Sequence, residues 1–327
     1  MKMNKKWFSA FMALLLLAGV LCGCSAAPVE GEEELVDLGA LLDEAVPLDG
    51  LPPISIVLSP SAPGTAVQQN SSAVIDYSNA KDGYIMIKWT GGSTSSKIKV
   101  LIKGPNNSED YQYNLRTDGS YDTFPLSDGN GQYSVRVYKQ VDGTKYSPVL
   151  TAKVSAQLTD EFAPFIRPNQ YVNYSDDSKA VTKAAEIIQE KGAGDNLSKT
   201  EAIYDWVVNN LSYDTAKASS VQSGYLPDID VTLAEKKGIC FDYAALMAAM
   251  LRSQNVPVKL VVGWTGSQYH AWINVWSESD GWVEGMIYFN GQNWELMDPT
   301  FASSGKQSKR IMEYIGDGKN YKARFLY

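Results

Sequence analysis

The stretch Gly238-Ile239-Cys240-Phe241-Asp242-Tyr243-Ala244-Ala245-Leu246 places a cysteine directly after a glycine-containing loop, at the start of an apolar run. Met247, Ala248 and Leu251 continue that run with helical spacing, which predicts a helix that begins at Cys240. Backbone N–H groups are unpaired in the first turn of a helix, and the helix dipole favours negative charge there. We therefore expect this position to stabilise a thiolate and to lower the thiol pKa.

His270 is the single histidine of the chain and thus the one imidazole that could serve this thiol. It begins a run predicted as a strand, 270–276, and Asp298 directly follows another, 294–297. If these strands pair, an acid at the end of one could hold the imidazole through its second nitrogen. Taken singly, the three residues also have ordinary structural interpretations, as a small core residue, a structural histidine and a turn former before proline.

Further motifs surround the three residues in a definite order. They are 204–207 (YDWV) and 211–214 (LSYD) upstream, the cysteine motif 238–246, then Arg252, 256–263 (VPVKLVVG), 270–272 (HAW), and 294–300 (WELMDPT). This series resembles the core of the transglutaminase-like superfamily, over about 195–302. The resemblance implies a papain-related fold with a Cys-His-Asp triad, in which Cys240 is the nucleophile, His270 the general base and acid, and Asp298 the orienting acid.

A thiolate of this kind attacks an amide carbonyl and forms an acyl-enzyme, which either an amine or water resolves. The triad alone leaves open whether the protein is a peptidase or amidohydrolase, or a protein-glutamine acyltransferase; the bacterial members that it resembles favour hydrolysis. Attack on the carbonyl produces an oxyanion that needs hydrogen-bond donors, and the backbone N–H of Cys240 is one such donor. Tyr213 is our candidate for the second, with Gln222 as the alternative. A non-catalytic surface binding protein that keeps the same fold is the competing interpretation.

Other residues of the motif are interpreted as structural. Asp242 and Tyr243 are expected to pack or cap the helix, and Trp272 is expected to wall the cleft. We predict no metal and no other cofactor, because the resemblance implies none and no Cys/His pair is left to bind zinc.

The N-terminus predicts export and a lipid anchor. Lys2, Lys5 and Lys6 precede an apolar run, 7–20, that is too short for a comfortable membrane span but suits a signal peptide. The sequence 21–24 (LCGC) then resembles the lipobox of bacterial lipoproteins, most similar to those of Gram-positive bacteria. It implies cleavage of 1–23 and acylation of Cys24, with the protein tethered to the outer face of the cytoplasmic membrane. The alternative is an uncleaved signal anchor.

Cleavage at this point leaves Cys240 as the one free thiol. In an exported protein, a single unpaired cysteine is either buried in a core or used for the chemistry of its thiol.

Composition allows two globular domains and excludes some partners. The chain has 327 residues, of which 44% are apolar, and its net charge is -8, becoming -11 once the three signal lysines are removed. This acidic balance argues against nucleic acid. The expected partners are a protein or peptide substrate at the cell envelope and, through the lipid, the membrane.

The chain divides into four predicted regions. After the signal, 24–70 is rich in Glu, Pro and Ser and is expected to be a flexible tether. Region 71–157 alternates short Val/Ile/Tyr-rich runs with Gly/Asn/Asp turns, which predicts an all-β sandwich resembling immunoglobulin or fibronectin type III modules. The sandwich could be a spacer or a peptide or glycan binder.

Region 158–327 is predicted to be the α+β transglutaminase-like domain, with helices first and antiparallel strands after them. The capping-box patterns that begin at Ser198 and Thr232 predict the starts of two of its helices. The residues 303–327 could pack on the sheet or cover the cleft.

Overall fold

The computed structural model describes residues 55–265, 268–279, 281–284, 287–289, 294–296 and 321–327. The chain divides into two units, Met1–Leu51 and Pro52–Tyr327, and all of the described residues belong to the second. Cys24, the predicted signal peptide and Asp298 lie outside the described residues. Within the described part, no helix has both the length and the apolar character that crossing a membrane requires.

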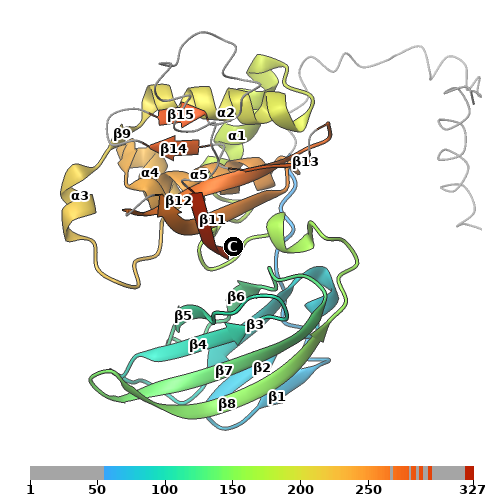
Figure 1. Ribbon diagram of the computed structural model, residues 1–327, viewed down its shortest axis with the longest axis vertical. Helices are drawn as coiled ribbons and strands as arrows, with labels where there is room; N and C mark the ends of the chain where they lie inside the picture. The colour runs from blue at the N-terminus through green and yellow to red at the C-terminus, as the bar shows by residue number, and fades with distance from the viewer. Residues whose placement is uncertain (1–54, 266–267, 280, 285–286, 290–293, 297–320) are drawn as a thin grey trace, which may run out of the picture. The chain divides into compact units, whose positions relative to one another are not determined.

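The first half of the described chain forms two four-stranded antiparallel sheets (Figure 1). One has the order β1 (Val67–Gln69), β2 (Ala73–Asp76), β3 (Tyr84–Trp89) and β6 (Asp122–Pro125). The other has the order β5 (Tyr111–Leu115), β4 (Ile98–Lys103), β7 (Gly131–Asp142) and β8 (Lys145–Ala156). The short helix η1 (Ala80–Asp82) precedes β3.

Alternation of side chains explains this arrangement. In β4, Ile98, Val100 and Ile102 are buried while Lys99 and Lys103 lie on the other face at intermediate exposure. Such a period of two buries one face of a sheet against its partner. A β-rich region before the α+β half is thus observed, whereas kinship with immunoglobulin or fibronectin type III modules remains a prediction.

Residues 55–70 differ from the flexible tether that the sequence predicts for 24–70. The N–H of Ile56 donates to the carbonyl of Ser253 (2.7 Å), and the N–H of Ser61 donates to the hydroxyl of Tyr84 (3.1 Å). β1 then pairs with β2 at the edge of a sheet. The reason is that an extended, proline-containing backbone can satisfy its polar groups on an existing surface even when it buries little apolar area of its own.

Helices and a third four-stranded antiparallel sheet make up most of the rest. The helices are η2 (Ala163–Phe165), α1 (Lys179–Lys191), α2 (Asn196–Asn210), α3 (Thr215–Ser220), α4 (Ile229–Glu235) and α5 (Cys240–Arg252). The sheet order is β13 (Gly281–Val283), β12 (Gln268–Ser277), β11 (Val258–Thr265) and β16 (Tyr321–Leu326). Two short pairs complete it: β9 (Ser212–Tyr213) with β10 (Lys237–Gly238), and β14 (Ile287–Phe289) with β15 (Trp294–Leu296).

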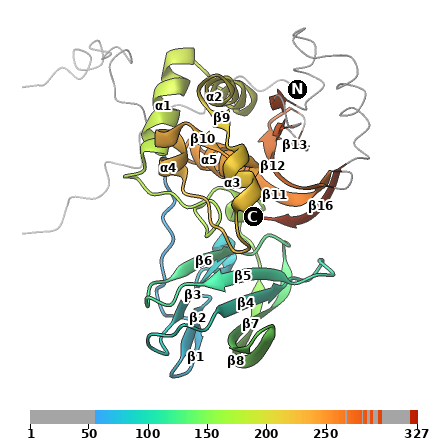
Figure 2. The same ribbon diagram turned by 90° about the vertical axis from the view of Figure 1, so that its left-hand side faces the viewer.

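Helix α5 is the centre of this half. It lies between the sheet and helices α1, α2 and α4, and contacts all of them (Figures 1 and 2). Every residue from Asp242 to Arg252 is buried, as the apolar sequence of this run predicts. A helix enclosed on all sides in this way gives its first residue a fixed position.

Two helix starts lie one turn earlier than the sequence patterns indicate. Helix α2 is capped by the carboxylate of Asp195, which accepts from the N–H of Ser198 at 2.7 Å, so Ser198 is the third residue of the helix and not its cap. Helix α4 is likewise capped by Asp228, and Thr232 lies within it. In both cases an aspartate upstream competes for the same backbone donors, and it is as good a cap as serine or threonine.

The end of the chain packs on the sheet. The N–H of Tyr327 donates to the carbonyl of Leu260 (2.8 Å), and the N–H of Leu260 donates back to the carbonyl of Tyr327 (2.9 Å). Buried Arg252 donates from its guanidinium to the same Tyr327 oxygen (2.6 Å) and to the carbonyl of Val258 (2.7 Å). The described part of the predicted C-terminal tail, 321–327, is therefore a structural strand.

Candidate active site

Cys240 is the first residue of helix α5, as the sequence predicts. The residue as a whole is half-buried, and it is the free cysteine of the described residues. Two residues later, the buried carboxylate of Asp242 accepts from the N–H of Ile239 at 2.8 Å and so caps the helix. The prediction that Asp242 is structural is confirmed in this respect.

His270 lies on strand β12, which packs against α5. Its pairing partner on β11 is Gly263, and the next residue, Ala271, hydrogen-bonds the sulfur of Cys240 through its backbone N–H. Cys240 and His270 also line the same cavity, whose volume is about 670 Å³. The structure thus brings together the thiol and the imidazole that the sequence singled out.

The pKa of the Cys240 thiol is raised from its ordinary value, which corrects the expectation from helix position alone. Burial is the largest cause, and the negative charge of Asp242 adds to it. Backbone hydrogen bonds from Ala271 and Phe241 act in the opposite direction but do not outweigh burial. Burial also lowers the pKa of His270, because it disfavours the imidazolium. Both shifts favour the neutral forms, a thiol and an uncharged imidazole.

Tyr213 reaches the same place from strand β9. Strand β9 pairs in parallel with β10, which ends at Gly238, two residues before the nucleophile. Burial raises the pKa of Tyr213, the charge of Cys240 raises it further, and a hydrogen bond with the backbone N–H of Cys240 opposes both. Tyr213 and the alternative candidate, Gln222, both line the cavity.

Trp272 does not wall the cleft as expected. It is buried at 3% exposure and is absent from the cavity lining. Its ring packs beneath Gly263, where a Cβ atom would come within 2.8 Å of it.

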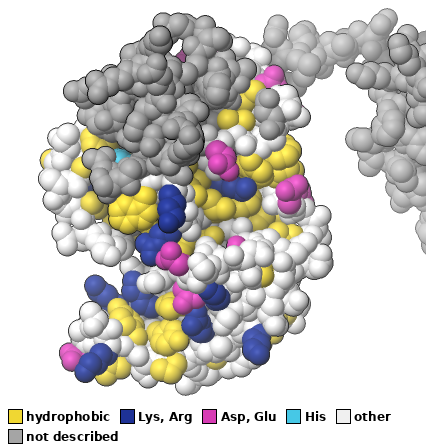
Figure 3. Space-filling model, viewed as in Figure 1, with side chains coloured by type: hydrophobic (Ala, Val, Ile, Leu, Met, Phe, Trp, Pro, Cys, Tyr) yellow, Lys and Arg dark blue, Asp and Glu magenta, His cyan; other side chains and the backbone are white. Residues whose placement is uncertain are grey.

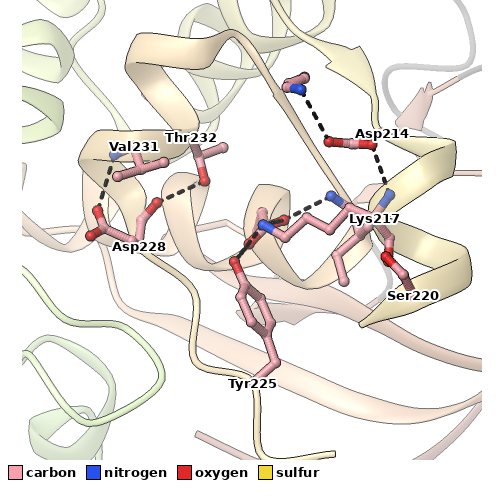
Figure 4. A network of polar contacts seen from close by, with 10 residues as sticks. Asp214, Lys217, Ser220, Tyr225, Asp228, Val231 and Thr232 are labelled. Carbon is pink, nitrogen blue, oxygen red and sulfur yellow. Dashed lines mark hydrogen bonds and ion pairs between the residues drawn. The ribbon is translucent and has the colours of Figure 1, made fainter. Parts of the chain in front are cut away.

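A buried polar network supports the loop beside the nucleophile (Figure 4). The fully buried carboxylate of Asp242 accepts from the ammonium of Lys217 at 2.7 Å and from the hydroxyl of Tyr225, and Lys217 also donates to Tyr225. Burial lowers the pKa of Lys217, but these hydrogen bonds outweigh it and the net shift is upward. Because residues 221–225 line the cavity, the network fixes one of its walls to the first turn of α5.

The β-rich region supplies another wall, which the sequence did not reveal. Lys99 of β4 and Gln112 and Asn114 of β5 line the cavity together with Arg324 and Phe325 of β16. Aromatic contacts join the two halves: the ring centroids of Tyr111 and Phe325 lie 5.0 Å apart, and those of Tyr113 and Tyr327 lie 5.7 Å apart; Tyr171 and Tyr327 are separated by 4.5 Å.

Two residues with predicted roles lie outside the described residues: Asp298, predicted to orient the imidazole, and Cys24, predicted to be lipidated. A search of the described residues finds no group of three or more His, Cys, Asp or Glu side chains that could hold a metal ion. The site thus contains a thiol and an imidazole that line one cavity, with backbone N–H groups next to the sulfur and the phenol of Tyr213 in the same lining.

The family comparison agrees with this geometry. Residues 182–285 match the model of the transglutaminase-like superfamily. The resemblance read from the motifs is confirmed for this segment, which is a transglutaminase-like domain and includes both Cys240 and His270. In general terms this supports a cysteine-based enzyme.

The chain is also similar to individual proteins. It is 29% identical over 143 residues to the UPF0252 protein MJ1282 of Methanocaldococcus jannaschii, covering 40% of this chain and 39% of that protein's length. Two solved structures have lower sequence identity to this chain. One, from Cytophaga hutchinsonii, is described provisionally as a cysteine protease (20% identity, TM-score 0.33, 61% of this chain and 77% of that one). The other, from Parabacteroides distasonis, is described provisionally as a protease (18% identity, TM-score 0.29, 59% and 38%).

Proposed function

We propose that this protein is a cell-surface cysteine enzyme that transfers the acyl group of a peptide or protein amide, either to water or to an amine. The observation that carries the proposal is the meeting of the Cys240 thiol and the His270 imidazole in one cavity, at the start of a buried helix. The match of residues 182–285 to the transglutaminase-like superfamily supports it.

The first step follows from the protonation states. Neutral His270 is a competent base, and it takes the thiol proton of Cys240 as the sulfur attacks the amide carbonyl. The resulting oxyanion needs hydrogen-bond donors. We assign that role to the Cys240 backbone N–H and the hydroxyl of Tyr213. In the free protein this N–H donates to the Tyr213 oxygen, and in the reaction the substrate oxyanion would replace that oxygen as its acceptor.

The second step releases the amine and then the acid or new amide. The C–N bond breaks, the imidazolium of His270 gives its proton to the departing amine, and a thioester remains on Cys240. Water or a second amine then attacks the thioester, transfers a proton to His270 and expels the sulfur, which regains its proton. Asp298, assigned from its motif, would orient the imidazole through the second ring nitrogen.

Incubation with a glutamine-containing peptide and a labelled amine tests the proposal and separates its two branches. Incorporation of the amine indicates transfer, while peptide fragments or free acid indicate hydrolysis. Either product should disappear in Cys240→Ala and His270→Ala. Product formation that survives Cys240→Ala would remove the proposed mechanism.

The non-catalytic alternative makes a different prediction for the thiol. If the fold is kept only for binding, Cys240 should resist iodoacetamide in the folded protein and react once the protein is denatured. The position of Cys240 in the lining of a cavity favours reaction in the folded state.

For localisation, we propose cleavage before Cys24 and lipid anchoring there, on the strength of the N-terminal sequence. Metabolic labelling with a fatty acid should mark the wild-type protein and not Cys24→Ala, and the wild type should sediment with membranes. An unlabelled wild type that still sediments with membranes would instead indicate an uncleaved anchor.

A further inference from the structure

The cavity differs in charge from the chain as a whole. The chain carries a net charge of -8, yet no aspartate or glutamate is among the described residues that line the cavity, whereas Lys99 and Arg324 both are. Figure 3 shows lysine and arginine side chains (dark blue) among hydrophobic ones (yellow) on the β-rich part of this face. A cavity with cations and without carboxylates attracts an anionic group.

The two cations are not equivalent. Arg324 already has a counter-ion, because its guanidinium pairs with the carboxylate of Glu109 at 2.6 Å. Lys99 forms no ion pair with the acidic side chains that the structure describes. Burial and, after it, the neighbouring charge of Lys97 lower its pKa, in agreement with the lack of an acidic partner among the described residues. A partly buried cation without a counter-ion is stabilised by a ligand that brings one.

Asn114 stands directly beside it. Lys99 of β4 and Asn114 of β5 are paired across the antiparallel ladder, so their side chains share one face of the sheet and lie next to each other. The side-chain oxygen of Asn114 is buried and has no hydrogen-bond partner among the described residues. Such an acceptor costs free energy until a donor reaches it. An N–H group of a bound peptide is a donor of that kind.

We propose that Lys99 and Asn114 form a substrate subsite that binds a peptide carboxylate and an adjacent peptide N–H. It would select acidic peptides, or peptides with a free C-terminus, for attack by Cys240. This inference rests on the proposed function for its use in catalysis. It also gives the β-rich region a part in substrate selection in place of the spacer role.

Equilibrium binding to the Cys240→Ser variant tests the subsite without requiring turnover. Four otherwise identical acetylated peptides are compared, carrying glutamate or glutamine at one position and a free or amidated C-terminus. At least one carboxylate should tighten binding by about tenfold, the effect expected of one hydrogen bond to a charged group. If glutamate binds more tightly than glutamine, the subsite binds a side-chain carboxylate. If the free C-terminus binds more tightly than the amidated one, the subsite binds a C-terminal carboxylate.

The decisive variant is Lys99→Met on this background, with Lys153→Met as its control. Lys153 is an exposed lysine of β8 that does not line the cavity, so its removal changes net charge equally. We expect Lys99→Met to abolish the preference for carboxylates and Lys153→Met to keep it. Three outcomes would overturn the subsite. They are equal binding of all four peptides, no detectable binding of any peptide, and a preference for carboxylates that survives Lys99→Met. Failure of the catalytic proposal would appear separately, as absence of product from the wild type.

Discussion

Gly263 lies directly opposite His270 in the pairing of β11 with β12. On its other side β11 pairs with β16, and the register shifts between Val262 and Gly263. This irregularity brings the carbonyl oxygen of Lys322 to within 2.2 Å of where a Cβ atom of residue 263 would stand. Glycine is therefore required here for the close approach of two backbones, directly opposite His270.

The first prediction concerns this contact. Gly263→Ala should lower the free energy of unfolding by about 1–3 kcal/mol. The added Cβ atom would clash with a backbone carbonyl, which cannot rotate away as a side chain can. It should also reduce kcat/KM by displacing His270. Gly194→Ala is the control, since no atom lies within 4 Å of its Cβ position. Chemical denaturation and peptide turnover measure both effects; a Gly263→Ala protein equal to wild type in stability would contradict the close approach.

The second prediction is a pH profile for the thiol. Burial disfavours the thiolate, so half-maximal iodoacetamide labelling of Cys240 should fall above pH 9.0, the ordinary thiol value. Rapid labelling across a pH series, read by mass spectrometry of the Cys240 peptide, measures this. A profile centred well below pH 9.0 that moves upward in His270→Gln would show a thiolate–imidazolium pair instead.

The third prediction is the acid limb of activity. Burial disfavours the imidazolium, so the His270 pKa lies below 6.5 and the neutral base persists to lower pH than for a free imidazole. The acid limb of kcat/KM should consequently fall below pH 6.5. An acid limb above that value would mean that the free enzyme does not carry His270 as described.

The fourth prediction concerns the network under the cavity wall. Asp242→Asn should cost about 3 kcal/mol of stability, because it removes one partner of a buried ion pair and leaves the other. Activity should fall as well, since the loop that Lys217 and Tyr225 anchor lines the cavity. The exposed Asp177→Asn is the control. An Asp242→Asn protein of unchanged stability would show that the network contributes little.

The fifth prediction uses a buried hydroxyl that lacks a partner. The hydroxyl of Tyr113 makes no hydrogen bond among the described residues, so Tyr113→Phe should leave stability unchanged or raise it by about 1 kcal/mol. Tyr133→Phe is the matched change, because the Tyr133 hydroxyl donates to the carbonyls of Gly129 (2.7 Å) and Leu126 (3.1 Å). That variant should lose about 1 kcal/mol. Denaturant unfolding of both checks the contrast, and a larger loss for Tyr113→Phe would contradict it.

Local patterns predicted much of the fold. The apolar run after Cys240 predicted α5, and β3 and β5 are two of the strands that the short Val/Ile/Tyr-rich runs of 71–157 predicted. The shorter strands β1 and β6 were missed, because three or four residues carry too little periodicity to register. Helix caps were misplaced where an aspartate one turn earlier was the stronger acceptor.

The site was predictable only in part, for a physical reason. Cys240 and His270 could be chosen from residue type and order, but the direction of the Cys240 pKa shift depends on burial, which the sequence does not contain. Likewise, Lys99 lies more than a hundred residues before Cys240, and only the tertiary packing of the β-rich region places it in the cavity. Long-range packing is thus the information that local patterns lack.

The most direct test is a search for the acyl-enzyme itself. A reactive acyl donor, such as a peptide ester, is mixed with the wild-type protein, quenched in acid, digested and analysed by mass spectrometry. The account predicts a thioester adduct on the peptide that contains Cys240, which decays with water or amine and is absent in Cys240→Ser. An adduct on another residue, or turnover of the donor with no adduct on Cys240 and unchanged rate in Cys240→Ser, would contradict it.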